Sequence, residues 1–141
     1  MAENSSVLTV SIVTPDGEVY SNDECSLAIV QTKAGDMGIM ADHIPLIAAL
    51  KIGSAKVNFN SESDVLAING GFVEFSNNLL TIVADSAERK GDIDVARANS
   101  AKARAEENLE KANKNQDADS MNRAEVALKR AINRINIAER N

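Results

Sequence analysis

One change of pattern, at residues 85–98, constrains the fold of this chain more than any other feature. All 7 glycines and both prolines lie at or before residue 91, and none follows. Before the change, apolar residues tend to alternate with polar ones, and turn residues recur every few positions. After it, Ala, Glu, Lys and Arg dominate. Alternation is typical of half-buried strands, and a run without Gly or Pro favours helix. The sequence therefore predicts two domains of different secondary structure.

The first part has the pattern of an all-β domain. Leu8, Val10 and Ile12 alternate with polar residues, as in a strand with one buried face. We expect strands over residues 8–12, 18–20, 26–32, 55–59, 65–68, 72–75 and 79–84. Residues 35–38 and 60–64 read as loops, and residues 76–78 as a hairpin turn. Residues 46–50 are uniformly apolar, which fits either a buried strand or a turn of helix. Many short strands predict a β-sandwich or a flattened barrel.

The second part predicts two helices with a polar reversal at residues 113–119. The first helix should run from residue 92 to residue 114, with Asp92 as N-cap and Asp94 in the first turn, where a carboxylate favours the helix dipole. The second should run from residue 120 to residue 139. The fold class is therefore α+β with segregated domains: an antiparallel β-sandwich over residues 1–87, a hinge at residues 88–91, and an antiparallel helical hairpin over residues 92–141. Gly91 is a natural backbone pivot.

Each helix carries one apolar stripe rich in alanine. The stripe of the second helix has spacings of three and four residues, which predicts a heptad-like seam. The expected seam residues are Val95, Ala98, Ala101, Ala105, Leu109 and Ala112 in the first helix, and Met121, Ala124, Leu128, Ala131, Ile135 and Ala138 in the second. Alanine buries little area, at about 25 cal/mol per Å². Such a hairpin should be marginally stable alone, and should need docking, a ligand or a partner.

Composition excludes several classes of function. Aromatic residues make up 3% of the chain and the net charge is −6, which argues against a nucleic-acid partner. Cys25 is the single cysteine, so an intrachain disulfide cannot form, which fits a reducing compartment. The first residues lack the pattern of a secretory signal, and the longest apolar stretch is too short to span a bilayer. We expect a soluble chain whose membrane association comes only through partners.

Catalytic and metal sites are also disfavoured. His43 is the only histidine, and it has no Ser or Cys partner at a recognisable spacing. A surface position for His43 is favoured, and a hydrolase that uses His43 is the alternative. A metal cluster is not expected without Cys and His pairs. Gly70-Gly71 does not open a phosphate loop, because no Lys-Ser/Thr follows. The sequence therefore predicts no catalytic residue and no metal site.

Four arginines on the two helices suggest an anion site. Arg97 and Arg104 are two turns apart, and Arg130 and Arg134 are one turn apart. Folding the hairpin about residue 116 brings Arg97 near Arg134 and Arg104 near Arg130. Arginine suits bidentate phosphate recognition, and four gathered guanidinium groups repel unless an anion joins them. The alternative, which geometry alone favours, is a solvated face balanced by acidic residues, namely Glu106, Glu107, Glu125 and Glu139.

Five segments, in order, carry a resemblance to a known family over essentially the whole chain. They are Val13-Thr14-Pro15-Asp16-Gly17; Gly35-Asp36-Met37-Gly38-Ile39-Met40 with His43-Ile44-Pro45-Leu46; Gly70-Gly71-Phe72-Val73-Glu74; Ala87-Glu88 with Ile93-Asp94-Val95-Ala96-Arg97-Ala98; and Ala124-Glu125 with Ala127-Leu128-Lys129-Arg130-Ala131-Ile132-Asn133-Arg134. The chain resembles the epsilon subunits of bacterial F-type, or rotary, ATP synthases. Each motif is weak alone, and the ordered set is specific.

The resemblance implies a function. Such subunits are non-catalytic and lie in the rotating central stalk, against the gamma subunit and the ring of c subunits, at the cytoplasmic face of the bacterial cell membrane. They couple rotation to proton flow. The mobile hairpin extends toward the alpha and beta subunits and inhibits ATP hydrolysis. In some members, ATP binds as a regulatory ligand and favours the compact state. The alternative is a stalk subunit of the same complex without a functional nucleotide site.

The resemblance also implies site residues, and it reverses the preference for a solvated face. The ATP-binding positions of the family match Glu88, Ile93, Asp94, Arg97, Ala98, Arg104, Arg130 and Arg134. The positions that face the c ring match Asp36 and His43. One departure lies beside His43, because the family usually has Pro-Gly where this chain has Ala41-Asp42. If that position needs φ > 0, Asp adopts it less readily than Gly.

Overall fold

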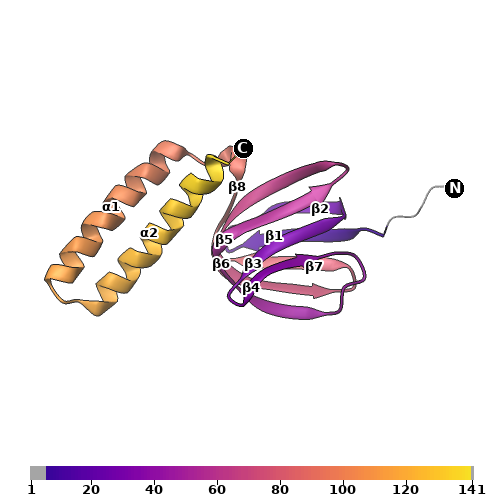
Figure 1. The fold of residues 1–141 in the computed structure, drawn as a ribbon, viewed down its shortest axis with the longest axis horizontal. Coiled ribbons are helices and arrows are strands. Elements are labelled where there is room, and N and C mark those ends of the chain that lie inside the picture. The colour runs from indigo at the N-terminus through magenta and orange to yellow at the C-terminus, as the bar shows by residue number, and fades with distance from the viewer. Residues whose placement is uncertain (1–5, 141) are drawn as a thin grey trace. The chain divides into compact units, whose positions relative to one another are not determined.

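A computed structural model describes residues 6–140 of the chain. It divides into two compact units, with the boundary between Arg89 and Lys90. The first unit is all β (Figure 1), and its strands are β1 (Leu8–Thr14), β2 (Gly17–Cys25), β3 (Leu27–Thr32), β4 (Gly35–Ile39), β5 (Leu46–Phe59), β6 (Glu62–Ser76), β7 (Leu79–Ala84) and β8 (Ala87–Arg89). The second unit contains a 3-10 helix, η1 (Lys90–Asp92), and two helices, α1 (Val95–Lys114) and α2 (Ala118–Ala138).

The strands form one sheet in the order β2-β1-β7-β6-β5-β3-β4, and β8 pairs with β6. Two long strands give this sheet its sandwich form. β5 and β6 pair along almost their whole lengths, whereas β6 pairs with β8 near Leu66 and with β7 beyond Gly71. Alternate residues of β1, β3 and β7 are buried, as the alternating sequence pattern requires. The predicted β-sandwich followed by helices is confirmed.

Three sequence predictions for the first unit need revision or are now decided. The sandwich is not fully antiparallel, because β1 and β7 pair in parallel, from Thr9 with Leu79 to Val13 with Val83. No tight turn joins these two strands, so nothing local fixes their relative direction. The predicted loops are wrong at residues 35–38, which belong to β4 and pair with β3, and at residues 62–64, which begin β6. Residues 46–50, left open between strand and helix, begin β5.

The helices begin at different residues from those predicted. Asp94, not Asp92, is the N-cap of α1, and its Oδ1 accepts a hydrogen bond from the backbone N–H of Arg97 at 3.0 Å. Asp92 belongs to η1 instead. The N-cap of α2 is Asp117, so α2 begins at Ala118 rather than at residue 120. Each carboxylate satisfies backbone donors that the first turn of a helix leaves without an intrahelical partner.

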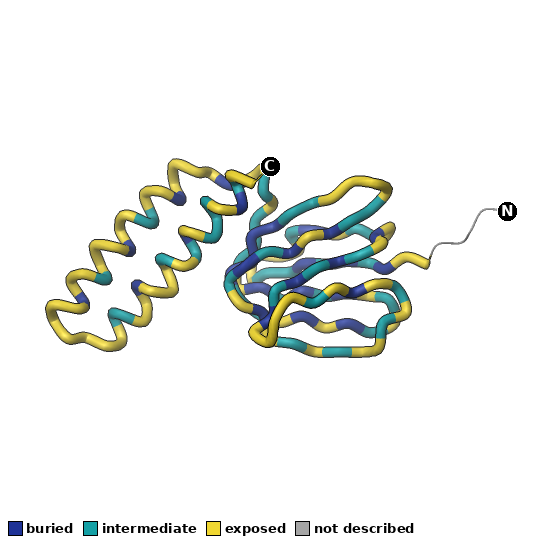
Figure 2. Tube along the Cα trace, viewed as in Figure 1, coloured by how far each residue is buried: buried dark blue, intermediate teal, exposed yellow. Residues whose placement is uncertain are grey.

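The predicted seam exists, and its buried positions are seven residues apart. Ala98, Ala105 and Ala112 are buried on α1, and Ala124 and Ala131 are buried on α2. Figure 2 shows these buried positions recurring along both helices. Heptad spacing keeps one line of small residues facing the partner helix, which lets the helices pack closely. Val95 departs from the prediction because it is 37% exposed. In the last turn of α2 the buried residue is Ile137 rather than the predicted Ala138.

The cap of α2 makes the stability of the hairpin depend on pH. Asp117 accepts from the Ser120 hydroxyl at 2.7 Å and from the Ser120 N–H at 3.2 Å. These hydrogen bonds lower the pKa of Asp117. A lowered folded-state pKa gives stability that is present above the unfolded pKa and lost as pH falls through the folded value. We expect circular dichroism to show that, below about pH 4, the parent loses helix content more steeply than the Asp117→Asn variant. Asp119→Asn is the control and should respond to acid like the parent. If Asp119→Asn responded like Asp117→Asn, the pH dependence could not be assigned to Asp117.

Candidate functional site

The predicted arginines hold equivalent positions beside the buried seam. Arg97 and Arg104 each precede a buried alanine of α1 by one residue, and Arg130 precedes Ala131 of α2 in the same way. A step of one residue turns a side chain by about 100° around the helix axis. When two antiparallel helices face each other through their seams, the residues that precede a seam residue by one position lie on the same side of the pair in both helices. The three arginines therefore lie on one flank of the hairpin.

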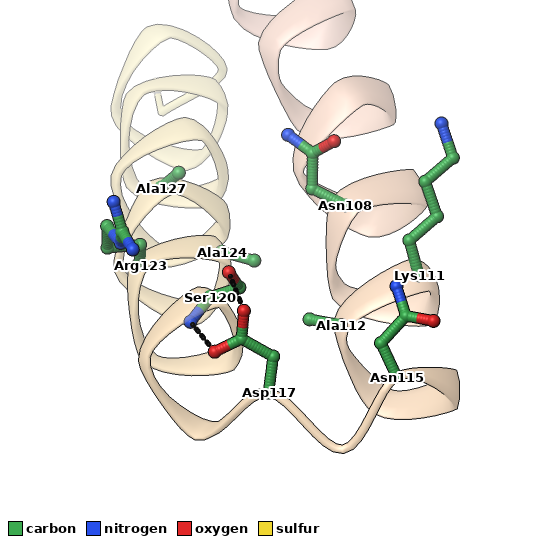
Figure 3. Close-up of a pocket in the computed structure, with 9 residues that line it drawn as sticks. All are labelled: Asn108, Lys111, Ala112, Asn115, Asp117, Ser120, Arg123, Ala124 and Ala127. Carbon is green, nitrogen blue, oxygen red and sulfur yellow. Dashed lines mark hydrogen bonds between the residues drawn. The ribbon is translucent and has the colours of Figure 1, made fainter.

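A groove near the turn supports this placement. Lys111 precedes Ala112, and Arg123 precedes Ala124, so both hold the position of the three arginines. Both line one groove of about 380 Å³, together with Asn108, Asn115, Asp117, Ser120 and Ala127. Figure 3 shows Lys111 on α1 and Arg123 on α2, on either side of the facing alanines. We call Arg97, Arg104, Lys111, Arg123 and Arg130 the basic flank. Arg134, three residues after Ala131, lies on the same side.

The arginines also match in height along the hairpin. At a rise of about 1.5 Å per residue, Arg97 lies about 26 Å from the end of α1, and Arg134 about 24 Å from the start of α2. The corresponding distances are about 15 Å for Arg104 and about 18 Å for Arg130. The helices are joined by a short turn, so these distances are measured from the same end. The four arginines therefore form two levels, one Arg from each helix at each level.

The remaining predicted residues divide between the two units. Ile93 and Ala98 are buried, whereas Asp94 is exposed and already caps α1. Glu88 is half-buried on β8, in the first unit. Arg97 and Arg104 are exposed, and Arg130 and Arg134 are half-buried. Hence seven of the eight predicted ATP-binding residues belong to the helical unit. Contact of these residues with ATP stays a prediction.

The sequence argument missed the lower part of the basic flank. Lys111 and Arg123 were not included among the candidate residues, although they continue the same line toward the turn. The signal was available, because each stands one residue before a seam alanine, as Arg97 and Arg130 do. Lys111 is partly neutralised, since its Nζ lies 2.8 Å from a carboxylate oxygen of Glu107. This pair is fully exposed, and such pairs contribute little to stability.

The second predicted site, which was expected to face a c ring, lies in the first unit. Asp36 is exposed on β4, and its Oδ1 accepts a hydrogen bond from Nε2 of Gln31 at 3.4 Å. His43 lies between β4 and β5. Its ring packs edge-on against the ring of Phe75, with centroids 6.0 Å apart, and its Nδ1 is 2.8 Å from the carbonyl oxygen of Ile44. No catalytic partner contacts His43 in these interactions.

The residue before His43 does adopt a left-handed conformation. Asp42 has φ of 64°, a conformation that Gly adopts more readily than Asp. It is held there by Asn78, which is 36 residues away. The backbone N–H of Asp42 donates to Oδ1 of Asn78 at 2.6 Å, and Nδ2 of Asn78 donates to Oδ1 of Asp42 at 3.1 Å. These two hydrogen bonds offset the strain and fix the loop that carries His43.

Removing the Asn78 side chain should therefore loosen this loop. Asn78 has φ of 57°, so Asn78→Gly keeps its backbone conformation accessible while it removes the side chain and its amide. We expect a loss of about 1 kcal/mol in unfolding free energy, together with a change in the NMR signals of His43. Asn77→Gly is the matched control, since Asn77 has φ of 52° in the same turn. Equal effects of the two substitutions on His43 would contradict the role of Asn78.

Cys25 and the acidic side chains are further candidate reactive groups within residues 6–140. Cys25 is buried, and burial raises its pKa to about 11, so its thiol stays protonated at neutral pH. Among residues 6–140, no three His, Cys, Asp or Glu side chains gather in a way that could hold a metal ion. Within the same residues, neither helix has both the length and the apolar character needed to cross a membrane.

Comparison with known proteins matches both units in order. Residues 7–90 match the family model of the ATP synthase Delta/Epsilon chain beta-sandwich domain, and residues 92–139 match that of the Delta/Epsilon chain long alpha-helix domain. The chain is 57% identical over 139 residues to the ATP synthase epsilon chain of Pediococcus pentosaceus, with 99% of both chains covered. The chain belongs to the ATP synthase epsilon-chain family. The epsilon chain of Levilactobacillus brevis is equally similar, at 57% identity and 99% coverage of both chains.

A solved structure shares the fold of this chain. A chain in the cryo-EM structure of the Euglena gracilis mitochondrial ATP synthase, described as OSCP/F1/c-ring, has a TM-score of 0.74 and 20% identity. The match spans 88% of this chain and 76% of the Euglena chain. This likeness concerns the fold. The resemblance inferred from five sequence segments, to epsilon subunits of bacterial F-type ATP synthases, is confirmed by the relatives and by the family models.

Proposed function

We propose that this epsilon chain is a non-catalytic regulatory and coupling subunit of the central stalk, and that ATP is its regulatory ligand. The basic flank of the hairpin supports this most directly. Its arginines Arg97, Arg104 and Arg130, with Arg134 on the same side, place four guanidinium groups at two levels, which suits the phosphates of a nucleotide. A mobile hairpin packed through alanines gains stability from any ligand that bridges its helices. ATP binding would favour the compact hairpin, which does not inhibit ATP hydrolysis.

The partners of this subunit would be the gamma subunit, the c ring, and the alpha and beta subunits. The surface of the sandwich supports a protein partner. Register places Ala49, Phe72, Val83 and Val13 side by side across β5, β6, β7 and β1. These residues alternate with buried ones and so lie on the outer face of the sheet. Phe72 is 43% exposed and Ile47 is 75% exposed on the same face. We assign this face to the gamma subunit.

The loop of Asp36 and His43 would face the c ring. An exposed Met40 and an exposed Ile44 lie in the same connection as His43, and exposed apolar residues of this size suit an interface. Through these contacts the subunit would be held peripherally at the cytoplasmic face of the bacterial cell membrane, and would couple rotation to proton flow. No metal is needed in this proposal, since arginine side chains alone would hold the phosphates.

A second function, a stalk subunit without a nucleotide site, has one observation in its favour. Arg97 and Arg104 are exposed, as cations of an ordinary solvated face are. In that case the arginines would serve only the extended, inhibitory hairpin. Substitution of Arg130 or Arg134 by alanine would then change inhibition and leave ATP binding as it was.

Reconstitution tests the regulatory role. An ATP synthase complex that has been depleted of its epsilon chain would receive either the full chain or a chain that ends at Gly91. We expect the full chain to lower ATP hydrolysis and the truncated chain not to, because only the full chain carries the hairpin. Millimolar ATP should relieve the inhibition. Equal hydrolysis with both chains would rule out inhibition by the hairpin.

A further inference from the structure

The flank of the hairpin opposite the basic flank carries a groove of different chemistry. Residues that follow a seam alanine by one position lie on this side, and Glu106, Asn113 and Glu125 hold that position. They line a groove of about 400 Å³ together with Leu109, Glu110 and Met121. We call this the acidic groove. It is bounded by both α1 and α2, near the turn of the hairpin.

The acidic groove combines a hydrophobic floor with a carboxylate rim. Leu109 and Met121 are half-buried, whereas Glu106, Glu110 and Glu125 are exposed. Methionine adapts its shape to a partner, which suits a docking surface. None of the lining residues is basic. Two of the rim carboxylates have lysines on their own helix, with Lys102 at 3.9 Å from Glu106 and Lys114 at 3.3 Å from Glu110. Exposed pairs of this kind are weak, so an incoming cation can displace them.

We propose that the acidic groove docks a basic amphipathic helix of a partner protein. Such a helix would place an apolar side chain against Leu109 and Met121, and lysine or arginine side chains against the rim. This is the usual way in which a groove between helices takes a helix, with anchors on one face of the ligand. Charge complementarity favours this occupant over an acidic or neutral helix, because unpaired like charges at the rim would oppose binding.

The opposite signs of the two flanks make this site independent of the nucleotide proposal. A phosphate-bearing ligand would meet the basic flank, and a basic helix would meet the acidic groove on the other side. Both ligands could be bound to one hairpin together, and each would contact both helices. Failure of ATP binding would therefore not affect the docking proposal. Docking at the acidic groove depends only on the packing of α1 against α2.

A peptide titration into the full chain tests the docking site. The probe is a labelled helical peptide about as long as α1, with leucine along one face and lysine on both sides of that face. Its counterpart has glutamate in place of lysine. We expect the lysine peptide to bind and the glutamate peptide not to. The double variant Glu106→Gln with Glu125→Gln should bind the lysine peptide about 3- to 10-fold more weakly, since two exposed ion pairs are lost.

A charge-matched control decides between docking and general attraction. The variant Glu107→Gln with Glu62→Gln loses the same charge outside the groove, and should bind the lysine peptide like the parent. Met121→Gln should also weaken binding, because it removes apolar floor. Equal weakening by both double variants would overturn the proposal. A second result would also overturn the proposal: the lysine peptide does not bind, the parent chain self-associates, and this self-association is lost in the Glu106→Gln, Glu125→Gln variant. The occupant of the groove would then be a second copy of the chain.

Discussion

Gly71→Ala should destabilise the sandwich by about 3 kcal/mol or more, and lower its melting temperature by roughly 10–20 °C. Gly71 has φ of 128°, which L side chains rarely adopt. A Cβ built there lies 2.0 Å from the backbone oxygen of Val83 and 2.9 Å from Cα of Ala84. These atoms belong to β7, which is paired with β6 at this point. The clash can be relieved only if strands separate.

Substitutions at two other glycines distinguish the effect of backbone strain from the effect of a steric clash of the added Cβ. Gly17 has φ of 119°, but a Cβ there meets no atom within 4 Å, so Gly17→Ala tests backbone strain alone. Gly91 has neither a positive φ nor a close neighbour, so Gly91→Ala should leave the fold intact. Thermal unfolding of the three variants should rank Gly71→Ala as the least stable, followed by Gly17→Ala. A Gly71→Ala protein as stable as the Gly17→Ala protein would contradict the close approach of β6 to β7.

Arg130→Ala should raise the dissociation constant for ATP by about 10- to 100-fold, because a hydrogen bond to a charged group contributes about 1.5–3 kcal/mol. Arg130 is half-buried on the basic flank, near the level of Arg104. Arg130→Lys should give an intermediate value, since lysine keeps the charge and loses the planar fork. The loss should be largest for the triphosphate, where the guanidinium groups have the most oxygens to contact.

Lys129→Ala is the matched control for this variant. Lys129 is exposed and stands next to Arg130 on α2. It precedes the seam residue Ala131 by two positions rather than one, so it does not hold the position that defines the basic flank. Binding is measured by calorimetry, with the melting temperature of each variant determined without ATP. If Lys129→Ala weakened ATP as much as Arg130→Ala, general electrostatic attraction would explain the binding. If neither did, the arginines would belong to a solvated face.

The sequence was sufficient for features that depend on local spacing. The alanines of the seam, the hairpin at residues 76–78 and the positions of the four arginines all follow from periods of two or of three to four residues. The end of α1 was placed correctly at Lys114, because polar residues follow it. The N-cap of α1 was misplaced by two residues. Gly91, Asp92 and Asp94 are all residue types found at N-caps, and only Asp94 accepts a hydrogen bond from the N–H of Arg97.

Features that depend on distant residues could not be obtained in this way. β4 contains two glycines and reads as a loop until β3 pairs with it. β5 and β6 read as three strands and one undecided segment, residues 46–50, because Gly53 and Gly70-Gly71 interrupt the pattern while the pairing continues through them. The parallel pairing of β1 with β7, and the hydrogen bonds of Asn78 to Asp42, join residues far apart in the chain. Loop conformation at His43 was thus open from sequence alone.

The central claim, that ATP stabilises this subunit through the basic flank, is tested most directly by titrating ATP into the purified chain and following its melting temperature. A ligand that binds only the compact hairpin stabilises it by RT ln(1 + [L]/Kd), or about 2.7 kcal/mol at 100 times Kd. We predict a saturable rise with ATP that inorganic phosphate at the same concentration does not reproduce. No rise at millimolar ATP, or an equal rise with phosphate, would contradict the claim.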